Sequence, residues 1–372
     1  MISLPERGGF RFPAPYGTTG VRLTNAQDGE ILPRTYSYWS NVSTGRRTLR
    51  VFLGTDRGPQ WWEVDTSSHE VTPRGLLFPA GHALAASTTE GWHWDWTDPD
   101  LLYCADDKHL YRYNFRSAAL ETVVDITPLD WTGRHAVRQW HMSGRRHSGT
   151  AMEMVDDGAW PKIGTVVYAE GACGSKWHWF PKIGENTLDE SQLDRSGTAL
   201  LIKETPPGHP GEDCRIIDLE TGEERLITDQ EGAPGHSDSG YGYVVGADNQ
   251  QALATWRLWD MKTLESRVIL TTPWEEQVSH VSHCNARPAA ADRQWVLGSG
   301  TLPDLITIPL DGSLRTRAVA PSMCHGADYD SLPRASLDPE GRYGCWLATP
   351  EGRRDAFLVK IPDQEAEACP TA

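Results

Sequence analysis

A short pattern recurs along the chain at intervals of about 48 residues, and it constrains the fold more than any other feature of the sequence. In each copy, an apolar run of strand-forming residues ends in small or polar turn residues. Copies begin at positions 51, 101, 151, 199, 295 and 344, so the spacings are 50, 50, 48, 96 and 49 residues. Because the gap of 96 residues is twice 48, we expect a seventh copy inside it, at Gln251–Trp256.

Most copies are followed by two further apolar runs that are joined by a tight turn. Examples are Trp61–Asp65 with His69–Thr72, and Arg215–Asp218 with Glu224–Ile227. The connecting residues are rich in Asp, Gly, Ser and Thr, which tolerate hairpin geometry. Four short strands in each period are typical of one blade of a β-propeller. The sequence therefore predicts an all-β chain that folds, over residues 1–372, as a single seven-bladed β-propeller domain.

The two ends of the chain complement each other. The last copy continues through Ala356–Ile361 and is followed only by the polar tail 363–372, without an outer strand. Near the N-terminus, residues 20–24 form a strand-like run that belongs to no repeat of its own. An unpaired sheet edge invites association with other chains. We therefore expect the N-terminal run to complete the last blade and to close the ring.

The third copy departs from the pattern between Val166 and Pro181. Cys173, Trp177, His178 and Trp179 fall in this stretch, which we expect to be an irregular insertion. Two interpretations stay open: the tryptophans roof a carbohydrate pocket, or they fill space between blades.

The charge of the chain limits its partners. A formal net charge of −16 argues against a surface that binds nucleic acid or an anionic membrane, although a local cationic pocket remains compatible with it. No apolar run approaches the roughly 18 residues that span a bilayer, and residues 1–7 lack the apolar core of a signal peptide. The seven cysteines are odd in number and form no CxxC pair, which favours a reducing compartment. We expect a cytoplasmic protein without nucleic-acid or membrane partners; its oligomeric state is left open.

Histidines recur at matched positions near the predicted starts of three consecutive blades. His236 and His280 are 44 residues apart, and His280 and His325 are 45 apart, while His283 follows His280 closely. The first strand of each blade lines the central channel of a propeller, so equivalent positions from different blades converge on one mouth. Imidazoles are general bases and metal ligands near neutral pH. We therefore expect a catalytic or metal-binding role for at least two of these four histidines.

The chain resembles the seven-bladed β-propeller polysaccharide lyases. The residues that carry the resemblance are Gly235-His236 at the start of blade five, His280 in blade six and His325 in blade seven. It is most similar in this respect to the oligogalacturonate lyases and more loosely to the ulvan lyases. The resemblance implies that His236 is the catalytic base, and that His280 and His325 hold a divalent ion such as manganese, calcium or zinc. No organic cofactor is implied. Where that family has a Gln and a His-x-His, this chain has Cys324-His325, so His283 is the residue we expect to complete the ligands.

The chemistry of β-elimination assigns further roles. Removal of the C5 proton of a uronate requires a base with a pKa near neutrality and a neutralised carboxylate. His236 is the first candidate for the base and His141 the second, Arg138 is placed to pair with the carboxylate, and Tyr241 to protonate the leaving oxygen. We expect an acidic oligosaccharide as substrate, bound by residues near the other blade starts: His82, Trp39, Gln139, Gln192 and Tyr329.

Two other classes of function stay open at this point. A glycoside hydrolase needs two carboxyl groups across a pocket, and Glu190 and Asp238 are the available pair. A propeller that binds a sugar or a protein without catalysis is the other, because a fold does not by itself imply chemistry.

Overall fold

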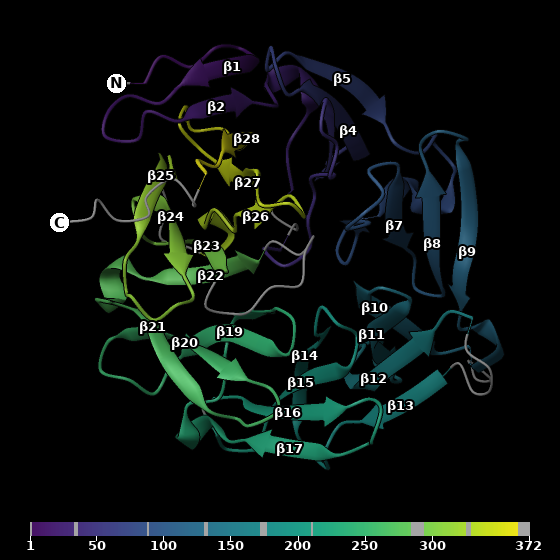
Figure 1. Ribbon diagram of the computed structural model, residues 1–372. Helices are drawn as coiled ribbons and strands as arrows, with labels where there is room; N and C mark the ends of the chain where they lie inside the picture. The colour runs from purple at the N-terminus through teal and green to yellow at the C-terminus, as the bar shows by residue number, and fades with distance from the viewer. Residues whose placement is uncertain are drawn as a thin grey trace.

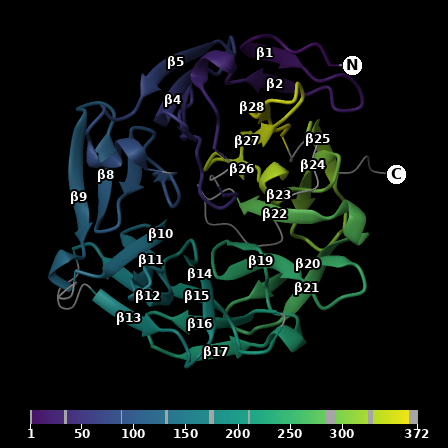
Figure 2. The ribbon, with the colours of Figure 1, turned by 180° about the vertical axis from the view of Figure 1, so that it is seen from behind.

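The computed structural model describes residues 2–32, 36–87, 89–129, 133–171, 177–209, 211–283, 294–324 and 329–363. These residues form seven antiparallel sheets arranged in a ring (Figure 1), which confirms the predicted seven-bladed β-propeller. Figure 2 shows the same ring from behind, with each sheet radiating outward from the centre. Within the described ranges, no helix is long and apolar enough to cross a membrane.

The blades consist of strands that follow one another in sequence, from the channel outward. Blade one is β3 (Thr48–Thr55), β4 (Gly58–Asp65) and β5 (Val71–Leu76), and blade two is β6 (His93–Trp94), β7 (Leu101–Ala105), β8 (His109–Asn114) and β9 (Ala119–Asp125). Blade three is β10 (His135–Ser143), β11 (Arg146–Glu153), β12 (Lys162–Ala169) and β13 (Trp177–Pro181). Blade four is β14 (Thr187–Leu193), β15 (Ala199–Thr205), β16 (Asp213–Asp218) and β17 (Glu224–Ile227). In blade one a single bridge, Val42 to Val51, stands where the other blades have an inner strand.

The remaining blades follow the same order. Blade five is β18 (Ser237–Ser239), β19 (Tyr243–Asp248), β20 (Ala254–Asp260) and β21 (Ser266–Thr272), and blade six is β22 (Val278–His283), β23 (Trp295–Gly300), β24 (Asp304–Pro309) and β25 (Arg317–Pro321). Blade seven combines β26 (Ser336–Leu337), β27 (Tyr343–Ala348) and β28 (Asp355–Lys360) with β2 (Thr19–Arg22) and β1 (Gly8–Arg11). Short 3₁₀ helices lie in the connections: η1 (Ala26–Asp28), η2 (Ala83–Ala86), η3 (Thr127–Leu129), η4 (Asp229–Glu231), η5 (Trp274–Glu276) and η7 (Tyr329–Ser331).

The N-terminus closes the ring as expected. β2 pairs antiparallel with β28, with Val21 opposite Leu358, and both side chains are fully buried. β1 adds a further outer strand that the sequence did not predict. The fully buried carboxylate of Asp355 accepts hydrogen bonds from Arg22 at 2.6 Å and from Thr24 at 3.0 Å. Side-chain packing and a buried ion pair therefore join the N-terminal strands to the last blade, and β2 lies beside β28 in Figure 1.

Two expectations about the repeats are wrong. The second strand of blade five is β19, and residues 249–253 form the turn before β20, so the strand predicted at Gln251–Trp256 does not exist as such. The chain turns tightly at 240–242 and starts the next strand at once, so the strand starts at 199, 243 and 295 are 44 and 52 residues apart.

The tryptophan-rich stretch of blade three is not an irregular insertion either, because β13 pairs with β12 in regular register. Cys173 lies outside the described residues.

The closure offers a test of one hydrogen bond. Thr18 donates its hydroxyl hydrogen to the carbonyl oxygen of Val319 at 2.6 Å in a buried position and so ties the N-terminal segment to blade six. Thr18→Val keeps the shape of the side chain but removes the donor, and it should lower the free energy of unfolding by about 1 kcal/mol. Urea unfolding of both proteins measures the difference. Thr122→Val on the exposed face of β9 is the matched control, and an equal loss in both variants would contradict the assignment.

Candidate functional site

Aromatic side chains from four blades meet at one end of the channel. The rings of His236 and His280 stack with centroids 4.9 Å apart and an angle of 19° between their planes. Tyr36, in the approach to blade one, lies 5.0 Å from His280, and Tyr329, in η7, lies 5.7 Å from His280 and 6.1 Å from His236. His236 precedes β18 and His280 lies in β22, so the ring architecture brings together residues that are up to about 290 positions apart.

Two hydroxyl groups and one guanidinium complete this cluster. The hydroxyl oxygens of Tyr36 and Tyr329 are 2.8 Å apart, and the Tyr329 oxygen is 3.4 Å from Nε2 of His280. The guanidinium of Arg334 lies over the Tyr329 ring at 4.2 Å and over the Tyr36 ring at 5.7 Å. A cation in this position is attracted by the ring faces. We call His236, His280, Tyr36, Tyr329 and Arg334 the mouth cluster.

The backbone conformation of Arg334 is energetically unfavourable. Its φ angle is +39°, a left-handed conformation that is rare for residues other than glycine, and it follows Pro333 immediately after η7. Nη2 of Arg334 donates to the backbone oxygen of Tyr329 at 3.0 Å. Strained conformations of this kind persist where the surroundings fix them, and they concentrate at functional sites.

A cavity of about 600 Å³ opens beside the mouth cluster. Its lining combines aromatic, cationic and acidic residues: Glu30, Leu32, Tyr36, Trp39, Glu90, Tyr329, Asp330, Arg334 and Arg354. The volume falls in the usual range for small-molecule sites, and the two arginines lie on an otherwise strongly acidic protein. His280 is buried at 1% exposure, whereas His236 is only partly buried.

A buried polar network supports the tyrosine wall of this cavity. The ring of Tyr38 lies 4.7 Å from that of Tyr36, and its hydroxyl donates to Glu190. Glu190 also accepts hydrogen bonds from Lys203, with which it forms an ion pair, and from Gln192 at 3.0 Å. The Lys203 side chain is 1% exposed and that of Glu190 is 7% exposed. Burial of an ammonium group is tolerated only when it is paired in this way.

Burial and neighbouring charges set the protonation states. Burial, together with the ammonium of Lys203, lowers the pKa of His236, and burial places the pKa of His280 well below its usual value. Burial and the nearby carboxylate of Glu190 raise the pKa of Tyr36, so the phenol stays protonated. Both imidazoles are therefore neutral at neutral pH, beside a phenol that keeps its proton.

The buried charges of Lys203 and Glu190 neutralise each other in the supporting network. Burial opposes ionisation of Glu190, but the attraction of Lys203 outweighs it and lowers the pKa of the carboxyl group. The same attraction outweighs burial at Lys203 and raises its pKa. The pair is therefore an ammonium and a carboxylate.

Three predicted residues lie around this network. His141 is buried, with its ring 5.0 Å from that of Tyr38, and burial lowers its pKa to about 3. Trp39 lines the cavity and donates from Nε1 to the backbone oxygen of Trp140 at 2.9 Å. Gln192 is buried and bonded to Glu190, so it supports the site from behind. Tyr329, also predicted, belongs to the mouth cluster itself.

The other four predicted residues have partners of their own. Arg138 is paired with Asp107 at 2.6 Å and lies beside blade two. Gln139 donates to Glu90, which lines the cavity, at 3.0 Å. His82 accepts a hydrogen bond from the backbone of Leu84 at 3.1 Å and stacks on Phe78, because it precedes η2 and not the inner strand β6. Tyr241 lies in the turn between β18 and β19, at the opposite end of β18 from His236.

The predicted metal ligands are not brought together in the described part of the chain. The Nε2 of His283 meets the hydroxyl of Tyr243, and its backbone N–H donates to Asp238 at 2.8 Å, so it faces blade five. His280 has a buried Nδ1 without a hydrogen-bond partner among the described residues, and its ring stacks on that of His236. No group of three His, Cys, Asp or Glu within the described ranges is arranged to hold a metal ion. The described residues alone therefore do not make up a metal site, and the predicted pairing of His280 with His325 falls on a residue outside the description.

Sequence reasoning missed Arg334 and Lys203. Lys203 did carry a signal, because it interrupts the apolar run of β15, and a charged residue there must find a partner. Arg334 carried none, since a proline–arginine pair in a connection is usually solvated. Glu190 entered only as a hydrolase carboxylate, but it and Asp238 are both held in buried ion pairs, with Lys203 and Arg195 respectively.

The channel contains a further histidine whose titration can be tested. His93 is 3% exposed, stacks on Tyr103, and has its pKa lowered to about 3 by burial. Between its folded pKa and about 6.5, only the unfolded chain binds this proton, so its effect destabilises the fold as the pH falls from about 6.5 toward 3. The free energy of unfolding of the wild type should therefore drop more steeply than that of His93→Phe, by about 1.4 kcal/mol per pH unit. Urea unfolding at about pH 6 and about pH 4 measures this, His209→Gln at an exposed position is the control, and parallel slopes for wild type and His93→Phe would contradict it.

Comparison with known proteins yields similarity of structure without similarity of sequence. No protein-family model and no curated protein matches the chain. An oligogalacturonate lyase from Vibrio parahaemolyticus superposes with a TM-score of 0.65 at 12% identity, covering 95% of this chain and 96% of that one. An oligogalacturonate lyase in complex with manganese gives a TM-score of 0.65 at 13% identity, with 96% of both chains covered.

The fold is shared more widely than with these lyases. A prolyl endopeptidase covers 91% of this chain and 52% of its own length at a TM-score of 0.52 and 12% identity. At identities this low, the similarity establishes the propeller fold alone, and the function must be argued from the site.

Proposed function

We propose that the protein is a lyase that cleaves uronate-containing oligosaccharides by β-elimination, with His236 as the base. The observation that carries this proposal is the mouth cluster. It places the phenol hydroxyls of Tyr36 and Tyr329 and the guanidinium of Arg334 around one cavity, with the neutral, partly exposed imidazole of His236 beside them. Two oligogalacturonate lyases share the propeller fold over nearly the whole chain, so the fold is compatible with this class of reaction.

The elimination needs three groups, and the cluster contains all of them. A nitrogen of His236 takes the proton from C5, and the electron pair of that C–H bond forms the C4=C5 double bond. The bond from C4 to the leaving oxygen breaks, and this oxygen takes a proton from the Tyr36–Tyr329 hydroxyl pair. Arg334 pairs with the uronate carboxylate, on which charge builds as C5 is deprotonated.

The base assignment predicts a pH profile. His236 must be neutral to accept the proton, and burial holds its pKa below the usual value of about 6.5. The acidic limb of kcat/KM should therefore lie below pH 6.5, with full activity retained at neutral pH. Initial rates between about pH 4 and pH 8 measure it, and a limb above about pH 7 would contradict the assignment.

The carboxylate assignment predicts the effect of one arginine. Arg334→Met should lower kcat/KM by about 10²- to 10³-fold, because a fixed charge that faces developing negative charge is lost. Arg138→Met, at the arginine that the sequence predicted for this role, should change kcat/KM little, since Arg138 lines a different cavity, beside blade two. The opposite order of the two effects would move the substrate carboxylate to Arg138.

The direct test is a panel of uronate oligosaccharides followed by ultraviolet absorbance of the unsaturated uronate product. We expect absorbance to rise with at least one member. Release of reducing ends without absorbance would indicate a hydrolase, and binding without turnover would indicate a non-catalytic propeller. Either result would overturn the proposal.

A further inference from the structure

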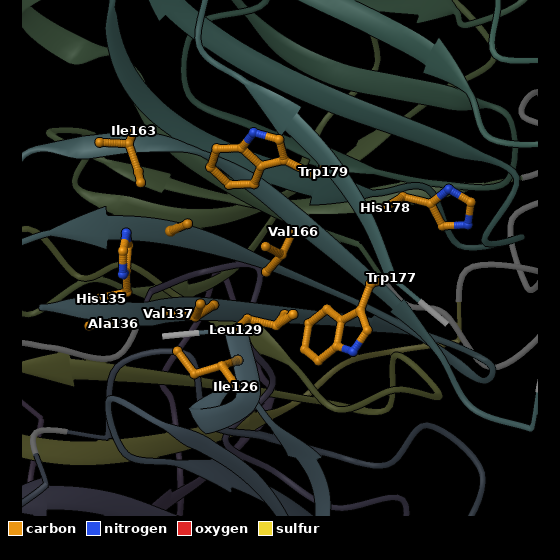
Figure 3. Close-up of a pocket in the computed structure, with 11 residues that line it drawn as sticks. Ile126, Leu129, His135, Ala136, Val137, Ile163, Val166, Trp177, His178 and Trp179 are labelled. Carbon is orange, nitrogen blue, oxygen red and sulfur yellow. The ribbon is translucent and has the colours of Figure 1, made fainter. Parts of the chain in front are cut away.

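A second cavity lies between blades two and three, and among the described residues it shares no lining residue with the cavity at the channel mouth. Its volume is about 350 Å³. Nearly all of its lining is apolar, as Figure 3 shows: Ile126, Leu129, His135, Ala136, Val137, Ala151, Ile163, Val166, Trp177, His178 and Trp179.

Two indoles form one wall of this cavity. Trp177 and Trp179 are two residues apart on β13, so strand alternation places them on the same face, and in Figure 3 both rings project toward the aliphatic side chains. His178, between them, points to the opposite side. The absence of a side chain at Gly164 makes room for Trp179, because a Cβ atom there would lie 2.6 Å from the indole. Trp177 rests against Tyr168, with ring centroids 4.9 Å apart.

Aliphatic side chains form the facing wall. Ile126 and Leu129 come from the segment around η3, after the last strand of blade two, and Val137 and Val166 come from blade three. Leu129 is 40% exposed and Trp179 is 48% exposed, so this wall and its rim leave large apolar surface in water. His135 on β10 also lines the cavity, and its Nε2 lies 4.0 Å from a carboxylate oxygen of Glu153.

We infer that this cavity is a binding site for a small planar apolar molecule, an aromatic ring system with at most one polar substituent. The space between indole faces and aliphatic side chains suits a flat ring, which stacks favourably on indole. The volume is that of a small-ligand site, and burying apolar surface is favourable in proportion to its area. A sugar is disfavoured, because the walls would leave most of its hydroxyls without hydrogen-bond partners.

Fluorine NMR on the full-length protein labelled with 5-fluorotryptophan tests this inference with 2-naphthol as the probe. Single Trp→Phe variants assign the resonances. We expect saturable, submillimolar shifts of the Trp177 and Trp179 resonances and none at Trp274, which is also partly exposed but lies in η5. The absence of a saturable shift would overturn the inference. Shifts of the same two resonances by maltose and not by 2-naphthol would also overturn it, in favour of a sugar platform.

Variants separate binding at this cavity from nonspecific adhesion. Trp179→Ala should weaken 2-naphthol binding at least tenfold, and Trp274→Ala should leave it unchanged. Ala151→Leu places a larger side chain in the cavity, so it should abolish binding without lowering the thermal midpoint. If this core variant does not fold, Trp179→Ala alone tests the site. Equal affinity in Trp179→Ala and wild type would overturn the inference. The result does not depend on the proposed lyase activity, because the two cavities are separate.

Discussion

Replacement of His236 by alanine should lower kcat/KM for uronate elimination by about 10²- to 10⁴-fold, the usual contribution of a general base. The imidazole is the partly exposed member of the stacked pair, is neutral at neutral pH, and lies 6.1 Å, between ring centroids, from the Tyr329 ring whose hydroxyl we assign as a proton donor. The loss should fall on kcat more than on KM, because the base acts in the transition state and contributes little to ground-state binding. Ultraviolet absorbance of the product in steady-state assays measures both constants.

The control for this variant is another buried histidine of a neighbouring strand. His283→Gln removes an imidazole that meets Tyr243 in blade five, so it should reduce stability and leave kcat/KM within a few-fold of wild type. Circular dichroism and thermal unfolding establish that both variants are folded. Full activity in His236→Ala would show that the base lies elsewhere, and His141→Ala would then be the next variant to assay.

Replacement of Lys203 by methionine should lower the free energy of unfolding by about 3–5 kcal/mol. The change leaves Glu190 as a buried carboxylate without its ammonium partner, and the Tyr38 hydroxyl and Gln192 remain as its hydrogen-bond donors among the described residues. Domains of this kind have about 5–15 kcal/mol of total stability, so the loss is a large fraction of it. Urea unfolding followed by tryptophan fluorescence measures the effect.

The double variant Lys203→Met/Glu190→Gln separates the ion pair from simple loss of packing. Removing both charges should cost less than the sum of the two single changes, because no uncompensated charge remains buried. If the losses of unfolding free energy in the two single variants simply add up in the double variant, Lys203 and Glu190 do not interact as a buried ion pair. The activity of the double variant also reports on the wall of the cavity, since Tyr38 supports Tyr36.

The position of Lys203 illustrates how sequence and structure divide the explanation. A lysine within the apolar run of β15 indicates that a buried acidic partner exists, but the sequence does not show which residue it is. Glu190 lies 13 residues earlier on β14 and is the partner only because β14 and β15 pair with a register shift between Leu188 and Ser191. Irregularities of this kind depend on packing against the neighbouring blades and leave no clear trace in a single sequence.

The histidines show the same division. Their spacing of 44 and 45 residues predicted that His236 and His280 would meet, and they do, at 4.9 Å. Strand alternation along β22 turns His283, three positions after His280, to the other side, and the structure places it against blade five. A shift of one residue in a strand reverses the direction of a side chain, and the register is set by long-range pairing.

The sequence by itself determined the seven blades and the closure of the last one by the N-terminus, because strand periodicity and turn composition are local properties that repeat along the chain. Only the tertiary structure decided which side chains share the channel mouth. Arg334 reaches Tyr36 and Tyr329 through a left-handed backbone and a ring that joins blade seven to blade one, and contacts across about 300 residues depend on the closed geometry as a whole.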